Sequence, residues 1–108
     1  MMFSYSKTKL LSSATALGAG KQLQIGLKKT LRIEAWGTGS FAIQIEAAGE
    51  SGTYRPLQIW DIAANGFVAN STISANGFYE IDVQGFNTVR ANVKTLTGGN
   101  VSASGVVI

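Results

Sequence analysis

The chain has 108 residues, which is enough for one domain with a single hydrophobic core. It contains neither cysteine nor histidine. This excludes disulfides, thiolate metal sites and cysteine nucleophiles, and it removes the commonest general base. Apolar residues make up 45% of the chain and charged residues 14%, the opposite of the balance in disordered chains. The composition therefore indicates a folded module that is not an enzyme.

The net charge of +3 is distributed unevenly along the chain. Residues 1–33 contain six basic and no acidic side chains, whereas residues 34–108 contain three basic and six acidic ones. A basic segment can meet an acidic surface, for example on a neighbouring copy of the chain. Nucleic acid is the alternative partner, but the lysines are dispersed, as on a solvated surface, so no nucleic acid is expected.

Residues 1–20 are predicted to form an N-terminal arm or an edge strand, followed by a domain at 21–108. Phe3 and Tyr5 alternate with serines, which is typical of a strand. Such a strand can join the edge of the domain or pair with a neighbouring subunit by strand addition. Residues 10–20 have room for one helical turn.

The beginning of the chain also imitates a secretory signal. Lys7 and Lys9 are followed by the stretch LLSSATALGAG, which ends in small residues. This apolar stretch is short and interrupted by two serines and a threonine, so we do not expect it to act as a signal peptide. No stretch approaches the roughly 20 apolar residues of a membrane helix.

Apolar residues then recur at every second position, which is the pattern of half-buried strands. Seven runs show it: 23–27, 31–35, 41–45, 57–62, 79–83, 89–93 and 101–107. Turn residues separate the runs, notably GTGS at 37–40 and TGGN at 97–100. Seven to eight short strands predict an all-β fold, a single antiparallel β-sandwich of the jelly-roll or C2/Ig-like type. A closed barrel is the alternative.

Two acidic residues, Glu80 and Asp82, fall on one face of one predicted strand, roughly 7 Å apart. This spacing suits paired carboxylates or calcium ligands. An exposed strand face produces the same pattern far more often, and no calcium-loop motif accompanies the pair. We therefore predict no catalytic residue, no metal ligand and no cofactor.

The aromatic residues Trp36, Tyr54 and Trp60 are candidate contacts for a glycan or a protein partner. Exposed aromatic rings stack on sugar rings and anchor protein interfaces. Trp36 falls on the polar side of its strand, although a core position explains a tryptophan equally often. The phenylalanines beside turn glycines, Phe67, Phe78 and Phe86, are expected to plug the ends of the sandwich.

Several structural motifs follow one another from residue 20 onward. They are the hairpin around GTGS, a loop from Glu46 to Leu57, the segment NGFYEIDVQGF at 76–86 and a closing hairpin from Val89 to Gly105. In this order they resemble small structural proteins of tailed-phage virions. That resemblance implies a β-sandwich that serves as a capsid decoration, head fibre, or neck or tail component. The chain less closely resembles the β-sandwich proteins of prophage lytic cassettes, the XepA/YomS type, which implies a ring-shaped oligomer and a role at host lysis.

These observations together predict a non-enzymatic phage structural protein that self-associates and docks on the virion, after synthesis in the host cytoplasm. Phe3, Tyr5, Lys7 and Lys9 are the predicted docking residues. The alternatives are a lysis-associated oligomer and a carbohydrate-binding module. The latter would contact host-surface glycans through the three aromatic residues Trp36, Tyr54 and Trp60.

Overall fold

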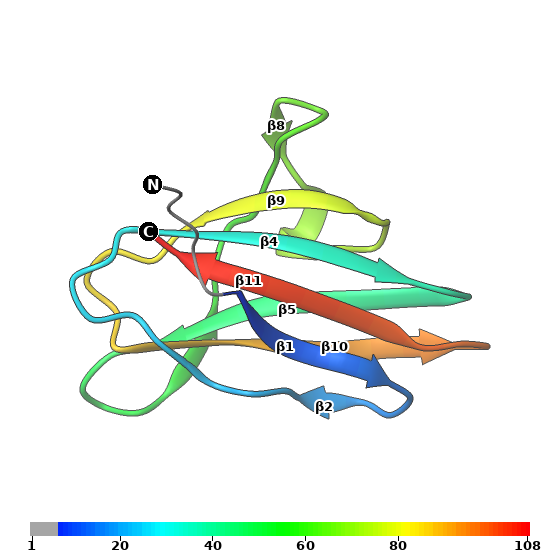
Figure 1. Cartoon of the computed structure of the whole chain (residues 1–108), viewed down its shortest axis with the longest axis horizontal. Helices are drawn as coiled ribbons and strands as arrows, with labels where there is room; N and C mark the ends of the chain where they lie inside the picture. Colours follow the sequence, from blue (N-terminus) through cyan, green and yellow to red (C-terminus); the bar gives the residue numbers. More distant parts are fainter. Residues whose placement is uncertain (1–6) are drawn as a thin grey trace, which may run out of the picture.

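Two antiparallel β-sheets face each other across one hydrophobic core in the computed structural model, which describes residues 7–108 (Figure 1). The larger sheet has the order β1 (Thr8–Ala14), β11 (Val101–Val107), β4 (Thr30–Gly37), β9 (Gly77–Asp82), β7 (Trp60–Asp61) and β8 (Gly66–Phe67). The smaller sheet has the order β2 (Gly18–Ala19), β10 (Thr88–Thr97), β5 (Ser40–Ala48) and β6 (Tyr54–Pro56), and β3 (Leu23–Gln24) also pairs with β10. A short 3-10 turn, η1, spans Ala69–Ser71. The predicted all-β sandwich is confirmed.

The core follows from the alternation in the sequence. In β4, residues 31, 33 and 35 are buried and point to the second sheet, while residues 32, 34 and 36 point outward. In β5 and β10, Ile43, Ile45, Val89 and Val93 fill the same core from the other side and are at most 1% exposed. Burial of these aliphatic side chains supplies the main driving force for folding.

Two adjacent hairpin loops hold one end of the sandwich together. The β4–β5 turn carries Gly39 at φ 74°, and the β10–β11 turn carries Gly98 at φ 72°. A Cβ atom at the next residue, Gly99, would collide with the carbonyl oxygen of Thr38. The turns predicted at 37–40 and 97–100 therefore use glycine both for its left-handed conformation and for close approach.

The structure divides the strands more finely than the sequence pattern suggests. Residues 7–108 contain eleven strand segments, of which six have six or more residues. In the run 57–62, Ile59 enters the core but only Trp60 and Asp61 pair as a strand. In the run 23–27, Gly26 turns the chain at φ 60° and leaves Leu27 99% exposed, so the predicted burial of Leu27 is wrong.

The N-terminal segment is part of the sandwich from residue 8 onward. Strand β1 lies at the edge of the larger sheet and pairs with β11, and β2 pairs with β10. The helical turn considered for 10–20 is not formed. The β1–β11 register shifts on both sides of Leu11, so the adjacent residues Leu10 and Leu11 are both buried. Phe3 and Tyr5 lie outside the described residues.

Strand β1 should therefore contribute to stability as a core strand does. We expect Leu10→Ala to lower the free energy of unfolding by roughly 2–5 kcal/mol, because it leaves a cavity in the core. Leu27→Ala removes the same atoms from a fully exposed site and should change stability by less than about 0.5 kcal/mol. Urea denaturation followed by tryptophan fluorescence measures both. Equal midpoints for the two variants would contradict this placement of β1.

Candidate functional site

The outward face of the larger sheet brings together most of the candidate residues. Cross-strand pairing places Lys9, Ser104, Glu34 and Phe78 in one row across β1, β11, β4 and β9. The next row contains Val106, Arg32, Glu80 and Trp60. Of the seven large apolar side chains exposed among residues 7–108, four line hollows on this face: Trp36, Ile62, Phe67 and Phe78.

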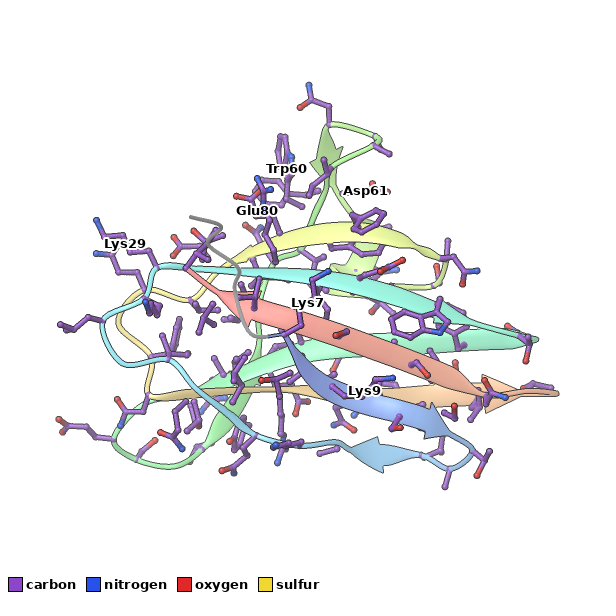
Figure 2. All side chains as sticks on the ribbon, in the orientation of Figure 1. Lys7, Lys9, Lys29, Trp60, Asp61 and Glu80 are labelled. Carbon is purple, nitrogen blue, oxygen red and sulfur yellow. The ribbon has the colours of Figure 1, made fainter. Side chains whose placement is uncertain are left out.

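The first hollow has a volume of about 600 Å³. Five of its lining residues make up what we call the docking face: Lys7, Lys9, Trp36, Ile62 and Phe78. Phe78 is 58% exposed, so its predicted role as an end plug is wrong. The Lys9 ammonium lies 5.5 Å from the centroid of the Trp36 ring, within the range of a cation–π contact. Figure 2 shows Lys7 and Lys9 along the β1 side of this sheet. Two of the four predicted docking residues thus lie beside exposed apolar side chains.

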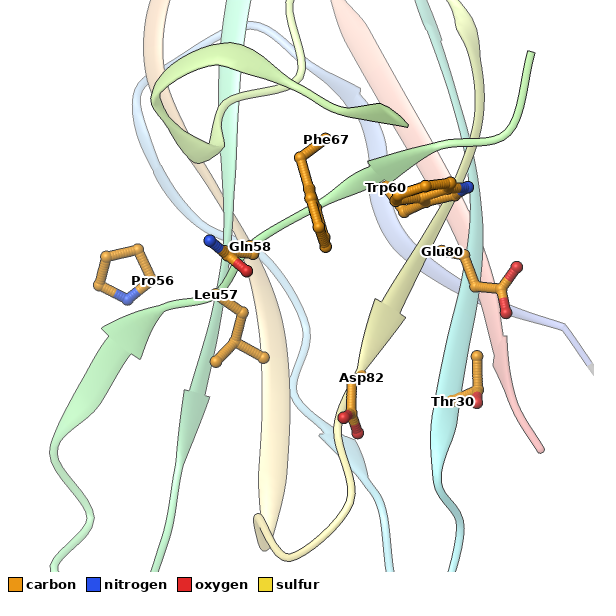
Figure 3. A pocket seen from close by; sticks show the side chains of 8 residues that line it. All are labelled: Thr30, Pro56, Leu57, Gln58, Trp60, Phe67, Glu80 and Asp82. Atoms are coloured by element: carbon orange, nitrogen blue, oxygen red, sulfur yellow. The ribbon is translucent and has the colours of Figure 1, made fainter. Parts of the chain in front are cut away.

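The second hollow, of about 580 Å³, lies where β9 and the β7–β8 hairpin of the larger sheet meet the end of β6 from the smaller sheet (Figure 3). We call it the Trp60 hollow, and its lining residues are Thr30, Pro56, Leu57, Gln58, Trp60, Phe67, Glu80 and Asp82. The Trp60 and Phe67 rings meet edge to face, with centroids 5.0 Å apart. Phe67 is 62% exposed, so it is not an end plug either.

A tight hairpin, β7–β8, positions both rings of the Trp60 hollow. The Asp61 carboxylate accepts hydrogen bonds from the amides of Ala63 and Ala64, and Asn65 adopts φ 54°, a conformation that asparagine tolerates. Pairing of Trp60 with Phe67 across this hairpin places the two rings on one side. Figure 1 shows the hairpin extending beyond the body of the sandwich.

The carboxylates of Glu80 and Asp82 lie on one face of β9, as the sequence predicts. Glu80 Oε2 accepts a hydrogen bond from Arg32 Nη2 at 3.4 Å, and Asp82 Oδ1 accepts one from the Gln84 amide at 3.0 Å. Among residues 7–108, no group of three or more potential ligands could hold a metal ion. The pair is thus tied to protein donors.

The third aromatic candidate, Tyr54, lies on the outward face of the smaller sheet. The Arg90 guanidinium covers its ring at 3.8 Å, and its hydroxyl bonds to Thr88 Oγ1 at 2.8 Å. Arg90 also donates to the buried carboxylate of Glu46 at 2.9 Å, and Asn92 donates to the other oxygen at 3.1 Å. The sequence does not reveal this network, because outward polar residues on two strands distant in the chain look alike before their register is known.

The three candidate aromatics therefore do not form one glycan site. Trp36 and Trp60 share the outward face of the larger sheet, but they lie four residues along and two strands across from each other. This separates their backbones by about 16 Å. Tyr54 faces the other side of the molecule and its ring is already covered.

Comparison with known proteins identifies the family of this sandwich. The XepA family model matches residues 5–107. The chain belongs to the XepA family.

Two solved structures share the fold. The structure titled SPBc2 prophage-derived protein YomS matches with a TM-score of 0.81 at 21% identity, and the match covers 100% of this chain and 98% of that one. The structure titled PBSX exported protein XepA matches with a TM-score of 0.80 at 18% identity. This match covers 99% of the present chain but 39% of the XepA chain. No curated protein sequence matches. The resemblance to the XepA/YomS group is confirmed, whereas the resemblance to tailed-phage virion proteins stays a prediction.

One titratable group of this XepA-family sandwich has a shifted pKa. Tyr79 on β9 is 3% exposed, and its hydroxyl donates a hydrogen bond to the Ala75 carbonyl at 2.7 Å. Burial, and secondarily the Asp61 carboxylate, raises the pKa of Tyr79 above its usual value of 10.0. Both effects disfavour the phenolate, which also could not donate to Ala75.

The raised pKa predicts a loss of stability at alkaline pH. The folded state holds the Tyr79 proton more tightly than the unfolded state, so its contribution is fully present below the unfolded pKa near 10. It is lost as pH rises from there through the folded pKa. Tyr79→Phe should lower the free energy of unfolding by about 0.5–1.5 kcal/mol at pH 7, because the hydrogen bond is lost. Above pH 10 the free energy of unfolding of this variant should fall less steeply than that of the unaltered protein. Urea midpoints of both proteins between pH 7 and 11 measure this, and parallel declines would contradict it.

Proposed function

We propose that this chain is a non-enzymatic structural module of a phage or prophage, which associates with copies of itself and docks on the phage particle through the docking face. Membership of the XepA family and the likeness to two prophage proteins support a phage origin. The absence of histidine and cysteine from the sequence supports a role other than catalysis.

The observation that carries the proposal is the exposed apolar patch of the docking face. Trp36, Ile62 and Phe78 are 37%, 40% and 58% exposed, and they line one hollow. Exposed apolar side chains that are contiguous and rimmed by charge mark protein interfaces, and aromatic residues are the usual anchors. Burial of this patch against a neighbour would be favourable without any change in fold.

Charge favours a second copy of the chain as the occupant. Lys7 and Lys9 flank the patch and give its β1 side a positive charge. Residues 34–108 contain three more acidic than basic residues, so they offer the complementary surface on the next copy. A contact between two different surfaces is heterologous, and repetition of it closes into a ring when the rotation permits.

The edge position of β1 supports the same arrangement. Among residues 7–108 its only strand partner is β11, and the Lys21 amide donates a hydrogen bond to the Leu10 carbonyl of β1 at 3.0 Å, so no second strand of these residues covers the edge beside Lys7 and Lys9. Lysines at a sheet edge discourage indiscriminate strand pairing. They leave the edge available to a partner with acidic side chains.

Self-association through the docking face predicts a mass that depends on these residues. In light scattering after size exclusion, the unaltered protein should form an oligomer that persists at moderate salt, because the contact is partly apolar. Lys7→Glu/Lys9→Glu and Phe78→Ser should each shift the mass toward the monomer. Lys21→Glu/Lys28→Glu changes charge equally outside the docking face and should leave the mass unchanged.

Two outcomes would argue against the proposal. A monomer at every salt and protein concentration would refute self-association. Loss of the oligomer in the Lys21/Lys28 control alone would place the contact elsewhere. Dye-loaded anionic vesicles provide a separate discrimination, since a docking module should release no dye whereas a lysis-associated oligomer that acts on membranes should.

A further inference from the structure

We infer that the Trp60 hollow is a binding site for one pyranose ring of a polysaccharide. This site is separate from the docking face, because the two hollows share no lining residue. It also differs from the three-aromatic site expected from the sequence, since it uses Trp60 without Trp36 or Tyr54.

The aromatic pair supplies a fixed stacking platform. Trp60 and Phe67 are held edge to face at an interplanar angle of 88°, which is a favoured geometry for two rings. This contact orients the indole ring, so little side-chain entropy is lost when a ligand binds. Figure 3 shows the two rings on one side of the hollow, with Thr30 and Asp82 across from them. The C–H face of a sugar ring is attracted to such an aromatic face.

Two carboxylates line the hollow together with the rings, Glu80 beside Trp60 and Asp82 farther along β9, and in each of them one oxygen is bound by a protein donor. Arg32 holds one oxygen of Glu80, and the Gln84 amide holds one oxygen of Asp82. Within residues 7–108, the second oxygen of each carboxylate, Glu80 Oε1 and Asp82 Oδ2, has no protein hydrogen bond. Each is therefore positioned to accept a charge-assisted hydrogen bond from a ligand hydroxyl.

The mixture of polar groups favours a neutral polyhydroxyl ligand over a cation. The carboxylates of Glu80 and Asp82 accept hydrogen bonds only, whereas Thr30 and Gln58 both donate and accept. A sugar hydroxyl can satisfy all of these groups, whereas an ammonium ligand can use only the acceptors. Arg32 also offsets one of the two negative charges, which weakens the attraction for a cation.

The dimensions of the Trp60 hollow agree with one sugar ring of a polysaccharide. Glu80 and Asp82 are two residues apart on one strand, so their backbones are roughly 7 Å apart. Their free oxygens can therefore reach two different hydroxyls of one pyranose. The hollow of about 580 Å³ falls within the range of roughly 300–1,000 Å³ of small-molecule sites.

The two tryptophans make a direct test available. Each indole N–H gives one signal in a proton–nitrogen spectrum, and Trp36→Phe assigns the pair. The probes are maltotetraose, mannotetraose and chitotetraose, with tetramethylammonium chloride as a cationic probe. We expect at least one tetrasaccharide to shift the Trp60 signal with a Kd of about 1 mM or tighter. The Trp36 signal should stay in place.

Matched variants connect the shift to the carboxylates. Asp82→Asn and Glu80→Gln keep the shape and should each weaken binding about tenfold, because a charge-assisted bond is lost. Glu34→Gln removes an equal charge from the docking side of the same sheet and should have no effect. The spectrum itself reports whether each variant is folded.

Four results would overturn the inference. The first would be that no tetrasaccharide shifts the Trp60 signal, and the second that a tetrasaccharide shifts the Trp36 signal instead. The third would be that tetramethylammonium shifts the Trp60 signal while the sugars do not, which would assign the hollow to a cationic ligand. The fourth would be that Glu34→Gln weakens sugar binding as much as Asp82→Asn does, which would indicate a general charge effect. None of these results depends on self-association through the docking face.

Discussion

The register of β4 between β11 and β9 is the constraint on which both hollows depend. It turns Leu31, Ile33 and Ala35 into the core and leaves Arg32, Glu34 and Trp36 outside. A slip by one residue would exchange the two sets and bury two charges and an indole. The aliphatic core thus enforces the register, and the register places Phe78 beside Glu34 and Glu80 beside Arg32. The arrangement of the surface is a consequence of how the core packs.

Alternation along the chain was sufficient to predict the sandwich and the long strands β4, β5, β9, β10 and β11, because one buried face imposes a period of two. It failed where local geometry breaks that period. The register shifts of β1 bury two consecutive leucines, so the strand has no regular pattern to detect. Gly26 redirects the chain and exposes Leu27, although Leu27 continues the alternation of Leu23 and Ile25.

The sequence predicts which way single residues of the candidate site face, but not which residues become neighbours. The outward orientation of Trp36 follows from its place in β4, and the shared face of Glu80 and Asp82 follows from their spacing. Their neighbours depend on pairings between residues up to 76 positions apart, as in Val107 with Leu31, which short-range patterns do not encode. Phe78 was misplaced for the same reason. Its turn glycine indicated the end of a strand, whereas pairing with Glu34 places it on the open sheet face.

The two outward faces differ in how far their polar groups satisfy one another. On the smaller sheet, Glu46 is held by Arg90 and Asn92, and Arg90 in turn covers Tyr54, so a ligand would have to replace good internal contacts. The larger sheet leaves apolar rings in solvent and carboxylate oxygens without protein donors. Burial against a partner removes the exposed rings from water, and the solvated carboxylate oxygens stay available to the donors of a ligand. On these grounds we propose the larger sheet as the binding face, whereas the polar groups on the smaller sheet satisfy one another.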